Sequence, residues 1–178
     1  MENKSELFYQ VLRSRRSVRQ YTDKEIPREA LDRILETGRL SPSAANGQPW
    51  SFIAVTKEHP KWAELHEVFY KDGFRKAPVV IAACAQPSKA WVRKEDSSNY
   101  AWVDVAIAVT EMILAATAEG IGTCWVASFD LARARKILNV PDGTEIVTLL
   151  TLGYPTEPLD IRKKDRKPMD QILHTGGW

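Results

Sequence analysis

Arginine side chains gather in one short stretch near the beginning of the chain. Arg13, Arg15, Arg16 and Arg19 fall within seven residues, and a second basic cluster spans residues 162–167. Guanidinium groups bind phosphates and carboxylates through paired hydrogen bonds. The first cluster therefore indicates either an anion-binding site or a basic turn in open solvent, and taken alone it favours the solvated turn.

A polar segment rich in turn-forming residues, SPSAANGQPW, spans residues 41–50. Its hydroxyl and amide side chains could hydrogen-bond the edge of a heterocycle. The same composition is also typical of a plain connection between a helix and a strand. Both interpretations stay open on these residues alone.

Other known catalytic and binding motifs are not matched, because the required residue types or their order along the chain differ. Gly120-Ile-Gly122 resembles the start of a dinucleotide fingerprint, but position 125 is Trp, and a helix rather than a strand precedes it. The sequence has no P-loop and no serine nucleophile elbow. Cys124 has no evident His partner, so a thiol nucleophile has little support. No histidine lies three or four residues from another His or a Cys, which argues against a metal site.

Composition narrows the class of protein. The 178 residues are expected to form one domain, 1–178, with a sizeable core. The 25 basic residues nearly balance 23 acidic ones, and the basic clusters lack interleaved aromatic residues, so we expect no nucleic-acid partner. Without a signal peptide or a convincing membrane span, we expect a cytoplasmic protein. Cys84 and Cys124 lie in apolar runs and are expected to be buried thiols rather than a disulfide.

The most apolar segment, residues 100–118, predicts a buried helix. Its cap is expected among residues 97–99 and its end at Gly120. The segment carries two charges, Asp104 and Glu111, and is not a convincing membrane span. These two residues share one side with several alanines. We expect a second subunit to pack on that side, with a helix of the same chain as the alternative.

The other side of this helix carries Trp102, Val109 and Ile113 and is expected to face the main core. Periodicity and end signals predict further helices at 5–13, 27–38, 62–70, 130–138 and 168–173, and strands at 51–56, 78–85, 123–128 and 145–152. Their irregular order favours a mixed α+β domain over regular βαβ winding. Residues 86–98 form either a mobile cover over a pocket or a surface connection.

Four stretches taken together resemble the flavin-dependent nitroreductase family. They are residues 15–21, 42–50, 120–125 and 164–168, and the resemblance covers nearly the whole chain in the right order. It implies an α+β sandwich with a central, mostly antiparallel sheet flanked by helices. It also implies an intertwined homodimer that holds FMN non-covalently at the subunit interface.

The resemblance implies a role for each matching position. Arg15, Arg16 and Ser17 would contact the FMN phosphate and ribityl chain, and Lys164 and Arg166 would return to the phosphate. Arg19 would lie near the pyrimidine end of the ring. The frame of the isoalloxazine would be Trp125, Val126, Ala127 and Ser128 of one subunit and the loop residues Pro42, Ser43, Ala44, Asn46 and Gln48 of the other.

The implied activity is that of an NAD(P)H oxidoreductase. A hydride would pass from the nicotinamide to flavin N5 and then to a nitroaromatic or quinone-type acceptor, in a ping-pong scheme without a catalytic protein residue. Some family members have Glu where this chain has Ala127, so that carboxylate cannot tune the substrate preference here. The alternatives are a dehydrogenase or dehalogenase on the same fold, or a non-catalytic flavin-binding protein.

Overall fold

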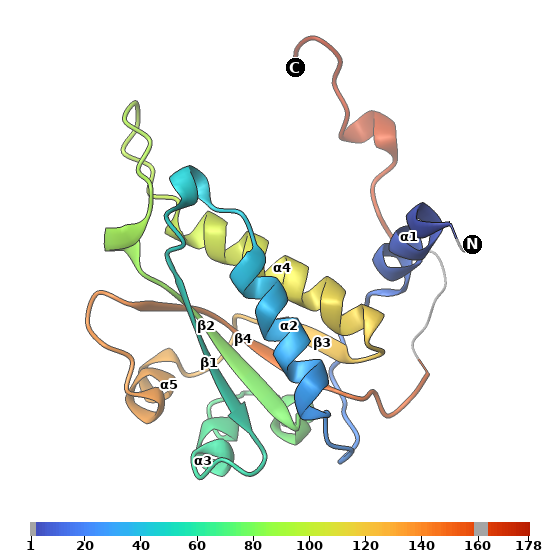
Figure 1. Cartoon of the computed structure of the whole chain (residues 1–178), viewed down its shortest axis with the longest axis vertical. Helices are drawn as coiled ribbons and strands as arrows, with labels where there is room; N and C mark the ends of the chain where they lie inside the picture. Colours follow the sequence, from blue (N-terminus) through green and yellow to red (C-terminus); the bar gives the residue numbers. More distant parts are fainter. Residues whose placement is uncertain (1–2, 159–163) are drawn as a thin grey trace.

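The computed structural model describes residues 3–158 and 164–178 (Figure 1). Within these residues, the strands form one antiparallel sheet in the order β1-β2-β4-β3. The strands are β1 (Trp50–Thr56), β2 (Val79–Ala85), β3 (Gly122–Val126) and β4 (Glu145–Gly153). All residues of β2 are buried, as its continuous apolar run predicts for a central strand. The α+β class and the antiparallel sheet are confirmed.

Helices cover both faces of this sheet. They are α1 (Lys4–Ser14), α2 (Arg28–Leu40), α3 (Trp62–His66), α4 (Ala101–Ala118) and α5 (Leu131–Leu138). Alternate residues of β2 point to opposite faces. Val80, Ala82 and Cys84 join the core under α3 and α5, whereas Ile81 and Ala83 join the core under α2 and α4. Both cysteines are buried free thiols, as expected, and burial raises the pKa of Cys84 to about 11.

Three predicted boundaries need correction. α3 ends at His66 rather than at residue 70. Phe69 instead forms an isolated antiparallel β-bridge with Phe129, and the chain then enters a 3₁₀ turn at Asp72–Lys76. α2 continues past Gly38, which lies inside the helix and against Met112. The last predicted helix is only a 3₁₀ turn, Met169–Gln171.

α4 ends as its sequence predicts but begins one residue after the predicted cap, since its N-cap is Tyr100, which makes no side-chain capping bond. Asn99 Oδ1 accepts a hydrogen bond from the Ala101 backbone N–H at 2.9 Å, and Gly120 adopts a left-handed conformation with φ of 72°. The mean hydropathy of α4, 1.6, and its length would also suit a membrane span. In this structure the helix packs on α2 and on the sheet, which gives it a role in the core.

The prediction for the two sides of α4 holds only in part. Val109 and Ile113 are buried as expected, at 0% and 9% exposure, and the alternative of a helix of the same chain applies to the small-residue side. Ala101, Asp104 and Ala108 are at most 1% exposed, and α2 and the loop after it cover them within the same chain. The close approach depends on Gly38, since a Cβ there would come within 2.6 Å of the Met112 sulfur. Trp102, which we expected in the core, is instead 52% exposed. Any partner of α4 would therefore contact the part of the helix that stays exposed, which includes Ala118 at the end of the predicted side.

Candidate functional site

The arginine-rich stretch is fixed along the outer edge of β3. Ser17 pairs with Thr123 in a parallel bridge, and the Val18 N–H donates to the Thr123 carbonyl at 2.8 Å. The buried Tyr21 hydroxyl lies 2.7 Å from both the Val18 carbonyl and Thr151 Oγ1. A rigid sheet therefore positions the arginines, which is unlike a loose basic turn in solvent.

Gly122 makes this close docking possible. A Cβ at this position would lie 2.6 Å from Val18 Cγ2. We expect Gly122→Ala to destabilise the fold by about 1–3 kcal/mol, the scale of an overpacked contact, as measured by urea unfolding. Gly177→Ala is the control, because no atom lies within 4 Å of its Cβ position. Equal unfolding midpoints for the two variants would contradict the close contact.

Four cations from the two ends of the chain converge beside α1. Lys164 Nζ donates to the Leu12 carbonyl, near the end of α1, at 2.6 Å. Burial lowers the pKa of Lys164, and the positive charges of Arg15, Arg16 and Arg166 lower it further. Like charges at this proximity disfavour one another, so the arrangement suits an anion. Residues 162 and 163 of the predicted basic cluster lie outside the described residues.

Two hollows meet at Arg19. The larger, of about 510 Å³, is lined by residues 16–20 and 155–158. The smaller, of about 180 Å³, lies where β3 ends and is lined by Arg19, Tyr70, Lys71, Phe74, Cys124, Trp125, Val126, Ala127 and Ser128. The structure thus brings together the predicted residues 125–128 and Arg19, and it connects them to the cation cluster through residues 16–19.

Tyr70 and Lys71 line the smaller hollow although the sequence analysis did not select them. Burial raises the pKa of the Cys124 thiol, and the charges of Arg19 and Lys71 oppose this rise, which places two cations near the same thiol. The sequence predicts that a helix ends at Tyr70, and Lys71-Asp-Gly73 has the composition of an ordinary turn. No local signal in these residues indicates a binding site.

The predicted loop residues lie elsewhere in the chain, near the beginning of α4. The Ala44 N–H donates to Asp104 Oδ1 at 3.0 Å, in the first turn of α4. α1 instead contacts the end of α4, where Phe8 and Leu114 line a common hollow. Ten residues of helix separate Asp104 from Leu114, or about 15 Å at 1.5 Å per residue. Within one chain, residues 42–48 are not assembled with the arginines (Figure 1).

This loop has an unusual backbone. Ala45, Asn46 and Gln48 have φ values of 50°, 55° and 46°, in the left-handed region. Residues other than glycine rarely adopt this conformation, which costs about 1–3 kcal/mol per residue and persists only where the surrounding structure imposes it. Such strain is concentrated at functional sites. The backbone therefore supports the interpretation of residues 42–48 as a binding loop.

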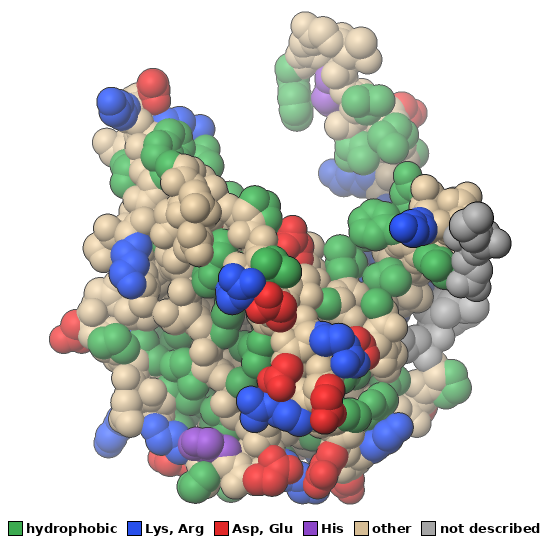
Figure 2. Space-filling model, in the orientation of Figure 1, with side chains coloured by type: hydrophobic (Ala, Val, Ile, Leu, Met, Phe, Trp, Pro, Cys, Tyr) green, Lys and Arg blue, Asp and Glu red, His purple; other side chains and the backbone are tan. Residues whose placement is uncertain are grey.

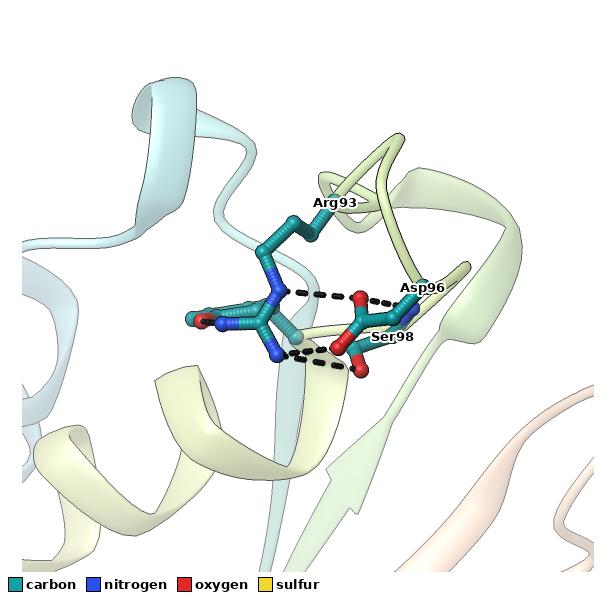
Figure 3. Close-up of polar contacts among 4 residues, drawn as sticks. Arg93, Asp96 and Ser98 are labelled. Atoms are coloured by element: carbon teal, nitrogen blue, oxygen red, sulfur yellow. Dashed lines mark hydrogen bonds and ion pairs between the residues drawn. The ribbon is translucent and has the colours of Figure 1, made fainter.

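Residues 91–100 form a hairpin that projects beside this loop (Figure 1). Arg93 Nε donates to Asp96 Oδ1 at 2.9 Å, and the same guanidinium contacts Ser98 Oγ and, at 3.0 Å, the Tyr100 hydroxyl (Figure 3). At the base of the segment, the Gln86 N–H donates to the Pro49 carbonyl at 2.7 Å. The segment 86–98 thus consists of a 3₁₀ turn at Pro87–Lys89 and most of this hairpin, and its first residue bonds Pro49, directly after the binding loop.

Comparisons with known proteins agree with this architecture. The family model described as "Nitroreductase family" matches residues 12–69 and 57–154. An Archaeoglobus fulgidus protein named "Putative NADH dehydrogenase/NAD(P)H nitroreductase" is 30% identical over 174 residues, covering 93% of this chain and 95% of that protein. Human iodotyrosine deiodinase 1 is 26% identical over 204 residues, covering 98% of this chain and 70% of that protein.

Solved structures show the same fold. A nitroreductase family protein from Clostridium difficile 630 superposes with a TM-score of 0.87 at 26% identity, covering 95% of this chain and 98% of that one. A Desulfovibrio desulfuricans protein solved in complex with FMN gives a TM-score of 0.79 at 26% identity, covering 100% and 99%. With its antiparallel sheet, docked arginine stretch and tail lysine in place, this chain belongs to the nitroreductase family.

Proposed function

We propose that this protein is an FMN-dependent oxidoreductase that takes electrons from NAD(P)H and passes them to a small acceptor of the nitroaromatic or quinone type. The observation that carries the proposal is that Lys164 of the tail bonds the end of α1 near Arg15, Arg16 and Arg166, while Arg16 also lines the larger hollow. The family consists of oxidoreductases, and a relative of the same fold is solved with FMN.

The residues present fit FMN at both of its ends. The four cations match a phosphate dianion, which guanidinium groups bind through paired hydrogen bonds. Arg19 and Lys71 bring positive charge to the smaller hollow, where a ring that gains negative charge on reduction would lie. That hollow, of about 180 Å³, is below the roughly 300–1,000 Å³ of ligand sites. A flavin ring placed there needs a further cover.

When bound, FMN would supply hydride transfer at its N5 atom. The part of this chain is to bind and orient the flavin and to favour its negatively charged form. Ala127 and Ser128 would approach the ring with their backbone groups, since Ala127 offers no carboxylate. Selection of the acceptor would then depend on the surrounding surfaces, among them Tyr70 and the hairpin at 91–100.

A homodimer would supply the missing cover. Asp104, which holds Ala44, and Leu114, which lines the hollow beside α1, are about 15 Å apart along α4, so a loop from a second copy is the simplest source of a cover. The C-terminal segment projects from the body (Figures 1 and 2), with Met169, Ile172 and Leu173 each about 60% exposed. Exposed apolar side chains in such numbers favour burial against a partner.

A second candidate reaction is reductive dehalogenation. It is supported by the similarity to iodotyrosine deiodinase 1, which covers 98% of this chain. It would use the same FMN site with a halogenated aromatic acceptor. The two reactions differ only in the acceptor, so one panel of acceptors compares them directly.

Flavin analysis tests the proposal. We expect the purified protein to be yellow and to release FMN rather than FAD on denaturation. Under anaerobic conditions it should oxidise NAD(P)H in the presence of a nitroaromatic, a quinone or iodotyrosine, and the fastest acceptor identifies the reaction. FAD, or no flavin after soaking in FMN, would contradict the cofactor. A yellow protein that fails to oxidise NAD(P)H with any of these acceptors would be a non-catalytic flavin-binding protein instead.

A further inference from the structure

The binding loop is attached to α4 through two carboxylates. Glu111 accepts a hydrogen bond from the Ser41 hydroxyl, at the beginning of the loop, and Asp104 accepts one from the Ala44 N–H. The two acidic residues are seven apart, so they lie on one side of the helix about two turns from each other. Asp104 is the deeper anchor, because it is only 1% exposed.

The conformation of the loop requires such an anchor. Its left-handed residues Ala45, Asn46 and Gln48 are all exposed, so packing around their side chains does not hold them. Bonds inside the loop, such as Gln48 N–H to Ser43 Oγ at 2.9 Å, close it on itself without orienting it. The charge-assisted bond from Ala44 to Asp104 fixes the loop to the core of the protein.

Asp104 is a poor residue for stability alone. Among the residues that the structure describes, its second oxygen, Oδ2, is buried and has no hydrogen-bond partner. A buried carboxylate with incomplete hydrogen bonding generally costs more stability than an apolar residue of similar size. The presence of a carboxylate in this apolar helix therefore calls for a role other than stability.

We propose that Asp104 is a positioning residue, which holds residues 43–48 in the strained conformation that frames the flavin ring. The inference rests on the proposed function for the identity of the ligand, but the hold of Asp104 on the loop does not depend on it. Loss of a hydrogen bond to a charged group corresponds to about a 10- to 100-fold change in an equilibrium. That is the effect expected on FMN affinity.

Two substitutions at Asp104 and one matched control test the inference. Asp104→Leu removes the acceptor, whereas Asp104→Asn keeps an oxygen that can accept from Ala44. Glu119→Gln is the control, because Glu119 joins α4 to α2 through Arg33 at 2.6 Å but does not touch the loop. Each protein is measured by hydrogen exchange without flavin, by FMN titration and by urea unfolding.

For Asp104→Leu we expect amide exchange in residues 44–48 to accelerate by about tenfold or more and FMN affinity to fall about 10- to 100-fold. The urea midpoint should not fall, and Asp104→Asn should lie between this variant and the wild type. The control should change neither exchange in the loop nor FMN affinity. Unchanged exchange in residues 44–48 of Asp104→Leu would overturn the positioning role.

A fall in affinity that only follows a fall in the urea midpoint would also overturn it. Failure of the proposed function has a different signature. In that case the wild-type protein binds no FMN, while the exchange measurements on the flavin-free proteins still decide whether Asp104 holds the loop.

Discussion

Alanine at Arg15 or Arg166 is expected to weaken FMN binding by about 1.5–3 kcal/mol, the scale of a hydrogen bond to a charged group. Both side chains belong to the cation cluster around Lys164, whose lowered pKa reports their proximity. The double variant should lose more affinity than either single one. The sum need not be additive, because neighbouring charges act on the same phosphate. Fluorescence titration of the flavin-free protein measures each affinity.

Riboflavin and a neighbouring arginine provide the controls. Riboflavin lacks the phosphate, so it should bind the variants and the wild type alike. Arg13→Ala removes an arginine from the same stretch, but Arg13 is exposed and pairs with Glu6 at 2.9 Å on the surface of α1. It should leave FMN affinity unchanged. If riboflavin binding falls as much as FMN binding, the arginines serve the fold rather than the phosphate.

The sequence predicted the helices and strands better than the tertiary contacts that they make. The apolar run of β2 identified a central strand. The end signals of α4 and α5 placed both helices within a residue or two. In α5, the cap residue Asp130 accepts a hydrogen bond from the Arg133 N–H at 3.0 Å. These are local features, in which nearby side chains satisfy backbone groups. The boundaries that failed, at α3 and at residues 168–173, depend on contacts with distant residues.

The residues of the binding site are brought together by long-range contacts, which local sequence patterns do not predict. The arginine cluster alone favoured a solvated turn, and only the resemblance to a family connected it with Lys164, about 150 residues away along the chain. Tyr70 and Lys71 reach the smaller hollow because the chain turns after α3, which no periodic pattern indicates. Composition can suggest an anion site, but the fold decides which side chains share it.

The sides of α4 show the same limit. Periodicity states which residues share a side, but it does not state what covers them. Asp104 and Glu111 were correctly placed together, yet their partners are Ala44 and Ser41 of the same chain. The small residues of α4 indicated a close contact with another helix, but not that the helix would be α2, which approaches over Gly38.

The exposed side of α4 now defines the expected dimer contact. Val103 and Ile107 are 47% and 37% exposed, and the same side continues to Leu114. Leu114 also lines a largely apolar hollow of about 420 Å³ together with Phe8 of α1. Helix residues four and seven apart lie on one face, so these three apolar side chains share one side of α4, with Thr110 between Ile107 and Leu114. A second copy of the chain is the partner that would also complete the flavin site.

Ile107→Arg is therefore expected to abolish dimerisation and FMN binding together, because an unpaired charge in an apolar interface costs several kcal/mol. The side chain is partly exposed, so the folded monomer should persist, and circular dichroism checks this. Leu131→Arg is the matched control: Leu131 is 48% exposed but lies on α5, on the other face of the sheet. Light scattering gives the mass of each variant.

Excess FMN should partly restore the Ile107→Arg dimer, since a ligand that binds only the dimer favours it by mass action. This coupling separates a shared site from a dimer contact that has no part in binding. If both chains form the site, dimer content and bound FMN rise together along one titration. A folded Ile107→Arg monomer that holds FMN as tightly as the wild type would place the whole flavin site within one chain. In that case the binding loop, which lies apart from the arginines within one chain (Figure 1), would have no part in that site.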